Sequence, residues 1–297
     1  MSGETAATLH GRLHIVGSVR SGTSLMHQLV STCFEIGAAC EHEMSIFDAP
    51  PECGGLFVSK HPGDVAVLHR ILDASANLHV VILDRDPRGV VTSIHPGWPR
   101  SYYADFRVWS AAHRAAKPLL DHPRVMRVRY ETLVARPDVV QQSMMTRFPF
   151  LSARHPFSDY HRFARVSAAA VRAMNGLRAI DPSRIDSWRE HLPRLRAQVL
   201  EHPALVEAVL DRYDDDPEWV RSLTQVAPLW AVSHRTGRSS PLRRVERAIR
   251  LRRNVARYLR SRPCSAARSS TDERRAASRV LVPRVGWSEP TRWPGVA

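Results

Sequence analysis

The chain has 297 residues, 43% of them hydrophobic and 24% charged, a composition typical of globular proteins that excludes wholesale disorder and collagen-like repeats. The net charge of +14 is uneven, because residues 235–297 hold 17 arginines against four acidic residues and the first 234 residues carry only +1. We therefore expect no specific nucleic-acid partner and predict a folded domain over 1–234 followed by an Arg-rich tail over 235–297.

Membrane spans, secretion and metal binding are not indicated. No apolar run approaches the 18 to 20 residues that cross a bilayer. The first ten residues lack a basic region followed by an apolar core, so we expect no secretory signal and a cytoplasmic location. The cysteines have no spacing typical of a disulfide framework or a zinc site, so we expect free thiols and no metal; they are Cys33, Cys40, Cys53 and Cys264.

Short apolar runs alternate with helical patterns along the first half of the chain. Strands are expected over Leu13–Val16, Leu56–Ser59, His79–Leu83 and Val125–Val128. Helical patterns follow Thr23, Asp64 and Asp105. We expect Asp64 to act as the cap of its helix. This alternation predicts an α/β fold of three layers, a parallel sheet flanked by helices as in P-loop NTPases. Beyond Tyr130 the pattern is mostly helical.

The tail contains one further helical pattern. Apolar residues recur at helical spacing among arginines over 241–262, which predicts a basic amphipathic helix, and the rest of the tail is predicted to be disordered. Such a helix is attracted to anionic surfaces, so one expectation is weak contact with an anionic membrane or a glycan. The protein would then be peripheral at the inner membrane surface. A solvated basic face is the alternative.

A glycine-containing loop, G-S-V-R-S-G-T-S over Gly17–Ser24, joins the first strand to the first helix. Backbone N–H groups and the positive end of a helix dipole converge on an anion in such a loop. Thr23 stands where the nucleotide-binding P-loop has lysine, and Arg20 lies inside the loop. The guanidinium of Arg20 is suited to bidentate hydrogen bonding with a sulfate or phosphate. A tight turn without ligand is the alternative.

The loop resembles the 5′-phosphosulfate loop of the sulfotransferases that use 3′-phosphoadenosine 5′-phosphosulfate (PAPS). That motif is a basic residue followed by S-G-T-[ST], and the matching residues here are Arg20, Ser21, Gly22, Thr23 and Ser24. The resemblance extends from about Leu13 to Trp219. It implies that residues 1–234 are the catalytic domain and that these five residues bind the cofactor PAPS.

Three further segments follow the family's order. Arg85 and Ser93, eight residues apart, match the pair that binds the 3′-phosphate, with Ser93 expected two helical turns beyond Arg85. Lys60, at the end of the second strand, matches the lysine that places positive charge on the oxygens of the breaking bond. Tyr130 begins the family's Y-E-x-L-x-x-x-P element and is expected near the nucleotide, while Glu131 braces the next helix.

The acceptor hydroxyl loses a proton as it attacks sulfur, so a base is required. Glu41 is our first choice, because in the tyrosylprotein type the catalytic glutamate follows the loop arginine by 21 residues; Glu43 and His61 are the alternatives. Ser187 stands where that type has a lysine before tryptophan, and Arg184 or Arg189 are the candidates to replace it.

The resemblance implies in-line transfer of a sulfuryl group from PAPS to a hydroxyl, without a metal. The expected acceptor is a carbohydrate, a peptide tyrosine, a lipid or a small metabolite. Two alternatives stay open, a small-molecule kinase with a degenerate P-loop and a basic anion-binding adaptor without catalysis.

Overall fold

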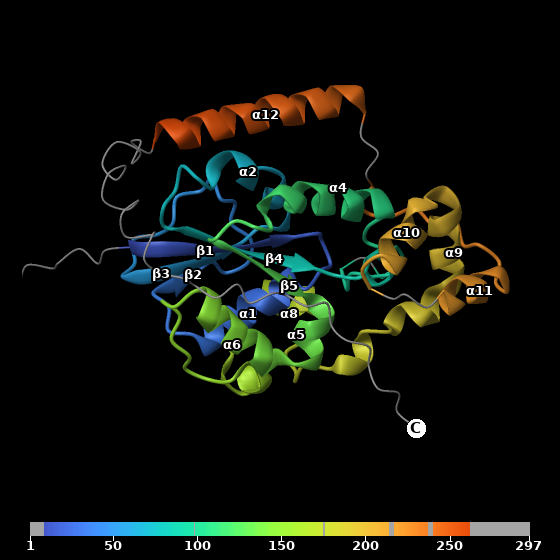
Figure 1. Cartoon of the computed structure of the whole chain (residues 1–297), viewed down its shortest axis with the longest axis horizontal. Coiled ribbons are helices and arrows are strands. Elements are labelled where there is room, and N and C mark those ends of the chain that lie inside the picture. Colours follow the sequence, from blue (N-terminus) through green and yellow to red (C-terminus); the bar gives the residue numbers. More distant parts are fainter. Residues whose placement is uncertain (1–8, 98, 175, 214–216, 237–239, 262–297) are drawn as a thin grey trace, which may run out of the picture.

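The computed structural model describes residues 9–261, except 98, 175, 214–216 and 237–239. Five parallel strands form the central sheet, in the order β2-β3-β1-β4-β5 (Figure 1). Their bounds are Leu9–Gly17 for β1, Ala38–Ala39 for β2, Gly55–Lys60 for β3, Leu78–Asp84 for β4 and Val125–Arg129 for β5. The four predicted strands and their parallel direction are confirmed. β2 has two residues and no apolar run that would predict it.

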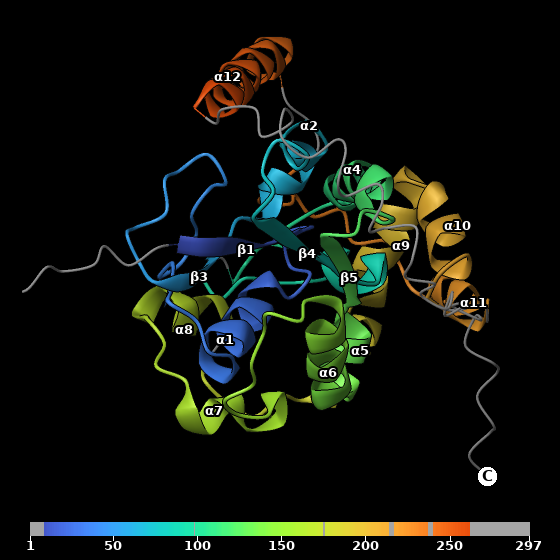
Figure 2. The same ribbon diagram turned by 60° about the vertical axis from the view of Figure 1, so that its left-hand side comes forward.

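Alternate residues of the strands face two helical layers, so the predicted three-layer α/β fold is confirmed. Leu13 and Ile15 of β1 join one buried cluster, and Val16 joins the other. The first layer contains α1 (Thr23–Cys33), α5 (Tyr130–Ala135), α6 (Pro137–Arg147), η3 (Phe157–Asp159), α7 (Tyr160–Phe163) and α8 (Ala168–Met174) (Figure 2). The second contains η1 (Pro62–Ala66), α2 (Leu68–Ile71), α4 (Phe106–Ala116), η2 (Lys117–Leu119) and α12 (Pro241–Arg260).

The helical second half packs beyond the end of β4. It contains η4 (Pro182–Arg184), η5 (Ser187–His191), α9 (Leu192–Glu201), α10 (Ala204–Leu210) and α11 (Glu218–Thr224). The last four of these share a buried cluster with α3 (Pro87–Val91). The guanidinium carbon of Arg88 lies 4.2 Å from the centre of the Trp188 ring, and Arg88 Nη2 is 2.6 Å from Asp86 Oδ2. This paired, buried charge ties the second half to the chain segment that follows β4.

The last described helix, α12, is attached to the second layer. The Tyr258 hydroxyl lies 2.9 Å from Ser75 Oγ, and the Tyr258 and Phe47 rings meet edge to face at 5.9 Å. The predicted amphipathic helix thus occupies 241–260, while the predicted disorder and Cys264 lie outside the described residues. None of the helices in the described ranges is long and apolar enough to cross a bilayer.

Candidate functional site

The glycine-containing loop lies at the carboxyl end of β1, where the chain connections diverge to opposite sides of the sheet. Gly22 precedes α1 with a φ of 93°, and a Cβ there would lie 2.6 Å from Cδ2 of Tyr130. Glycine is therefore required, both by conformation and by the closeness of the ring. The first turn of α1 contains no acidic residue, so its N–H groups and its positive dipole end are free to meet an anion.

Two arginines meet at this loop. Arg85, which follows β4, donates from Nη1 to the backbone oxygen of Arg20 at 2.8 Å. Its guanidinium carbon lies 4.2 Å from the centre of the Tyr130 ring, and a Cβ on Gly89 would lie 2.9 Å from Arg85 Nε. Burial and the nearby charge of Arg85 lower the pKa of Arg20 to about 10. The guanidinium group of Arg20 is therefore still positively charged at neutral pH.

Arg20 and Arg85 line the same pocket, a cavity of about 350 Å³. Of the residues expected from the sequence, its wall includes Arg20, Gly22, Thr23, Ser24, Arg85, Ser93 and Tyr130. Arg178 and Arg184, from the helical second half, add two more cationic side chains to the wall. The pocket therefore suits a ligand with more than one anionic group.

Two of the expected residues are placed differently from the expectation. Ser21 is fully buried outside the pocket wall, and both its N–H and its hydroxyl donate to the backbone oxygen of Ser18, so it supports the loop. The expectation that Ser93 lies two helical turns beyond Arg85 is wrong, because α3 ends at Val91. Ser93 instead accepts a hydrogen bond of 2.9 Å from Nε of Arg20, which joins the two predicted anion sites.

Lys60 lies at the end of β3 with only 2% of its surface exposed. Its Nζ donates to Ser24 Oγ at 3.0 Å and forms an ion pair of 3.3 Å with Glu43 Oε1. Burial lowers the pKa of Lys60, and the charge of Glu43 offsets part of that effect. Lys60 is not part of the pocket wall; it lies behind Ser24 and reaches the loop through that hydroxyl.

The three candidate bases differ in position. Glu43 contacts Lys60, as described above. Glu41 is exposed and is not part of the pocket wall, and its backbone oxygen accepts from Ser167 Oγ at 3.2 Å. His61 Nδ1 lies 2.8 Å from Asp64 Oδ1, which raises the pKa of His61. Of these three candidates, only Glu43 contacts Lys60, which in turn bonds to the loop through Ser24.

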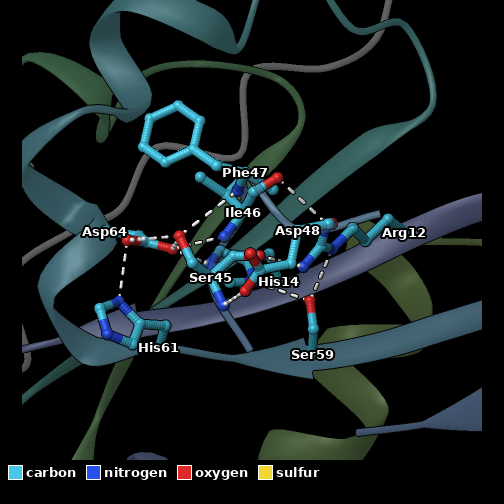
Figure 3. A network of polar contacts seen from close by, with 9 residues as sticks. All are labelled: Arg12, His14, Ser45, Ile46, Phe47, Asp48, Ser59, His61 and Asp64. Atoms are coloured by element: carbon cyan, nitrogen blue, oxygen red, sulfur yellow. Dashed lines mark hydrogen bonds and ion pairs between the residues drawn. The ribbon is translucent and has the colours of Figure 1, made fainter. Parts of the chain in front are cut away.

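A chain of buried polar groups beneath this segment was not anticipated (Figure 3). Arg12 Nε donates to Ser59 Oγ at 2.7 Å. The ionised Asp64 can only accept, so His14 Nε2, 3.2 Å from Asp64 Oδ2, carries the ring proton, and burial lowers the pKa of His14. The other ring nitrogen, Nδ1, then accepts from the Ser59 hydroxyl at 2.8 Å. Burial alone would raise the pKa of Asp64, but the hydrogen bonds from His14 and His61 outweigh it and hold the pKa below its usual range.

This polar chain fixes the segment that carries Glu43. Asp64 accepts from the Ile46 N–H at 2.6 Å, and Arg12 donates to the backbone oxygens of Ser45, Ile46 and Asp48. The Met44 N–H donates to the Lys60 backbone oxygen at 3.0 Å, which places residue 43 beside Lys60. The expectation that Asp64 caps a helix is wrong: Asp64 lies within the 3₁₀ helix η1, and its carboxylate binds the 45–46 segment and two histidines.

The replacement for the missing lysine before Trp188 has two candidates. Arg184 lines the pocket, and its backbone oxygen accepts from Ser187 Oγ at 3.0 Å. Arg189 is not part of the wall; its guanidinium carbon lies 4.4 Å from the centre of the Trp188 ring. The structure therefore brings Arg184, and not Arg189, to the pocket.

The segment near Glu43 also holds a thiol and an imidazole. Cys40 Sγ lies 3.5 Å from His27 Nε2, and burial, together with the charge of Lys60, lowers the pKa of His27 to about 4.

Across the described part of the chain, no group of three or more His, Cys, Asp or Glu side chains is arranged to hold a metal ion.

No family model and no curated protein matches the sequence. Solved structures similar to it include a sulfotransferase domain from the Synechococcus PCC 7002 olefin synthase, with 15% identity, a TM-score of 0.46 and coverage of 62% of this chain and 88% of that one. A sulfotransferase domain from the curacin biosynthetic pathway has 16% identity, a TM-score of 0.45 and coverage of 62% and 92%. A mouse sulfotransferase complexed with PAP has 10% identity, a TM-score of 0.43 and coverage of 75% and 92%.

Proposed function

We propose that this protein is a sulfotransferase that uses PAPS as donor and a hydroxyl compound as acceptor. The observation that carries the proposal is that Arg20 and Arg85 line one pocket and are joined by a hydrogen bond, with Lys60 directly behind the loop. Separate pockets for the two arginines would have ruled out one ligand with anionic groups at two positions. PAPS is such a ligand, because its nucleoside carries a 5′-phosphosulfate and a 3′-phosphate.

The residues present fit this donor. Gly22 has no side chain to obstruct an anion at the first turn of α1, where the Thr23 and Ser24 N–H groups and Arg20 would hold the 5′-phosphosulfate. Arg85 and Ser93 would hold the 3′-phosphate from the other side of the same wall. Arg184 adds charge, and Tyr130 keeps the Arg85 guanidinium in place through its ring face.

When bound, PAPS supplies the sulfuryl group. Lys60, held by Ser24, would stabilise the negative charge that develops on the phosphate oxygen as the sulfur–oxygen bond breaks. We assign proton removal from the acceptor hydroxyl to Glu43 in preference to Glu41, because Glu43 contacts Lys60 and is held there by the backbone bond between Met44 and Lys60. The proton then resides on Glu43, and the acceptor oxygen has formed the new bond to sulfur.

The expected acceptors are a carbohydrate, a peptide tyrosine, a lipid or a small metabolite. The test is incubation with ³⁵S-labelled PAPS and a panel of such hydroxyl compounds, with EDTA present. We expect labelled product and release of PAP, the desulfated nucleotide, because Arg20, Arg85 and Lys60 provide the positive charge that a metal provides in kinases. Transfer of phosphate from ATP that requires Mg²⁺, with no transfer from PAPS, would establish the kinase instead.

A further inference from the structure

Helix α12 has two opposite faces. At about 100° per residue, Leu251, Val255 and Tyr258 lie on one side of the helix. Leu242, Val245 and Ile249 lie on the other side, and they are 77%, 57% and 45% exposed. A single helix therefore carries one apolar face toward the protein and a second one toward solvent.

The inner face fixes how the helix lies. Val255 and Tyr258 are buried in the cluster that also contains α2 residues, and the Tyr258 hydroxyl bonds to Ser75. Figures 1 and 2 show α12 as the outermost element beyond α2. The outer apolar stripe thus points away from the rest of the described protein.

The helix is also strongly basic. The helix has eight arginines and one acidic residue, Glu246, which gives it a net charge of +7. Seven of these arginines are exposed: Arg243, Arg247, Arg250, Arg252, Arg253, Arg257 and Arg260. By the same rotation, Arg252, Arg253 and Arg260 lie on the side of the stripe and continue it toward the end of the helix, and Arg250 and Arg257 flank that side. Arg243 and Arg247 lie nearer the side of Val255 and Tyr258.

We propose that the outer face of α12 binds the surface of an anionic lipid bilayer. The three aliphatic side chains would enter the boundary between headgroups and acyl chains, and the arginines would meet lipid phosphates, as in interfacial helices. A nucleic acid would satisfy the arginines but would leave the aliphatic stripe in water. The combination of exposed aliphatic and cationic residues on one face therefore fits a membrane surface better.

The test is co-sedimentation of the full chain with vesicles of phosphatidylcholine alone and of phosphatidylcholine with phosphatidylglycerol at about 3:1. We expect at least ten-fold stronger partitioning to the anionic vesicles, falling as salt rises, since each arginine near an anionic surface contributes about five-fold. Replacing Leu242, Val245 and Ile249 together by serine should lower partitioning at least ten-fold. Replacing Arg252, Arg253 and Arg260 by glutamine should do the same.

Matched controls separate the helix from general effects. Val139→Ser and Leu200→Ser remove equally exposed aliphatic residues elsewhere, both 55% exposed, and should bind vesicles as the wild type does. Unchanged thermal unfolding of the α12 variants would show that the inner face stays docked. Equal partitioning to neutral and anionic vesicles, or wild-type partitioning of the triple serine variant, would overturn the proposal. So would tighter binding to duplex DNA that is indifferent to the serine substitutions.

Discussion

The carboxylate of Glu43 lies 3.3 Å from the ammonium of Lys60, although 17 residues separate them along the chain. The contact depends on pairing between the segment after β2 and the end of β3, where the Met44 N–H bonds to the Lys60 backbone oxygen. It places a carboxylate next to a lysine that also bonds to the glycine-containing loop through Ser24.

The Glu43→Gln variant should therefore transfer sulfuryl groups at least about 100-fold more slowly, because glutamine cannot accept the proton of the acceptor. Its affinity for PAP should change little, since Glu43 does not line the pocket of Arg20 and Arg85. Single-turnover transfer of ³⁵S measures the first effect, and calorimetric titration measures the second. Glu41→Gln is the matched control and should keep the wild-type rate. The opposite pattern would assign the base to Glu41.

Gly22→Ala should lower the free energy of unfolding by about 2 kcal/mol, because alanine is strained at a φ of 93° and its Cβ would collide with Tyr130. Displacement of that ring should also weaken PAP binding, since the Arg85 guanidinium lies over it. Urea denaturation and calorimetry measure the two effects. Gly63→Ala is the control: its Cβ would meet only the His61 ring, at 3.5 Å, and we expect a change within about 0.5 kcal/mol.

Asp64→Asn should lower the free energy of unfolding by about 3 kcal/mol near pH 6, because it breaks the pairs with His14 and His61. The raised pKa of His61 gives stability that is complete below about pH 6.5 and lost as pH rises through the folded value. The lowered pKa of Asp64 gives stability that is lost only below about pH 3.9. The wild type should therefore exceed the variant by more at pH 6 than at pH 8.5.

Denaturation of both proteins at the two pH values measures that difference. The exposed Asp73, which pairs with His122 and Arg124 at the surface, provides the control. Asp73→Asn should change the free energy of unfolding by less than about 1 kcal/mol at either pH. A penalty for Asp64→Asn as small as that of Asp73→Asn would contradict the account of the buried polar chain.

Local sequence patterns were sufficient for four of the five strands and for the loop, because apolar runs and glycine spacing reflect the conformation of neighbouring residues. Ser93 lines the pocket together with Arg20 and Arg85, but it does not reach the pocket in the way that its spacing predicts. Its distance from Arg85 suggests a continuous helix, whereas α3 ends at Val91 and Ser93 bonds to Arg20. The end of a short helix depends on tertiary contacts that a spacing rule does not contain.

The contacts of Glu43 and the buried polar chain could not be read from local patterns. Both arise from the register of segments 17 to 50 residues apart, which no periodicity reports. One signal was available: within β1, Arg12 and His14 alternate with the apolar residues Leu13 and Ile15. Polar residues on one face of a buried strand require buried partners, and here these are Ser59 and Asp64.

Arg184→Gln should weaken PAP binding about ten-fold, because Arg184 lines the pocket and a lost charged hydrogen bond to phosphate costs about that much. Arg189→Gln should leave affinity within two-fold, since Arg189 lies on the Trp188 ring outside the wall. Calorimetric titration of both variants checks the difference. Equal losses of PAP affinity in the two variants would contradict the assignment of Arg184, rather than Arg189, to the pocket.

The central claim is that one ligand reaches from the loop at Arg20 to Arg85. Calorimetric titration with PAP and with adenosine 5′-monophosphate, in EDTA, tests it most directly in the wild type and in Arg85→Ala. We predict that the wild type binds PAP at least ten-fold more tightly than the monophosphate and that Arg85→Ala removes this preference while keeping monophosphate binding. An undiminished preference for PAP in Arg85→Ala, or PAP binding that requires Mg²⁺, would contradict the account.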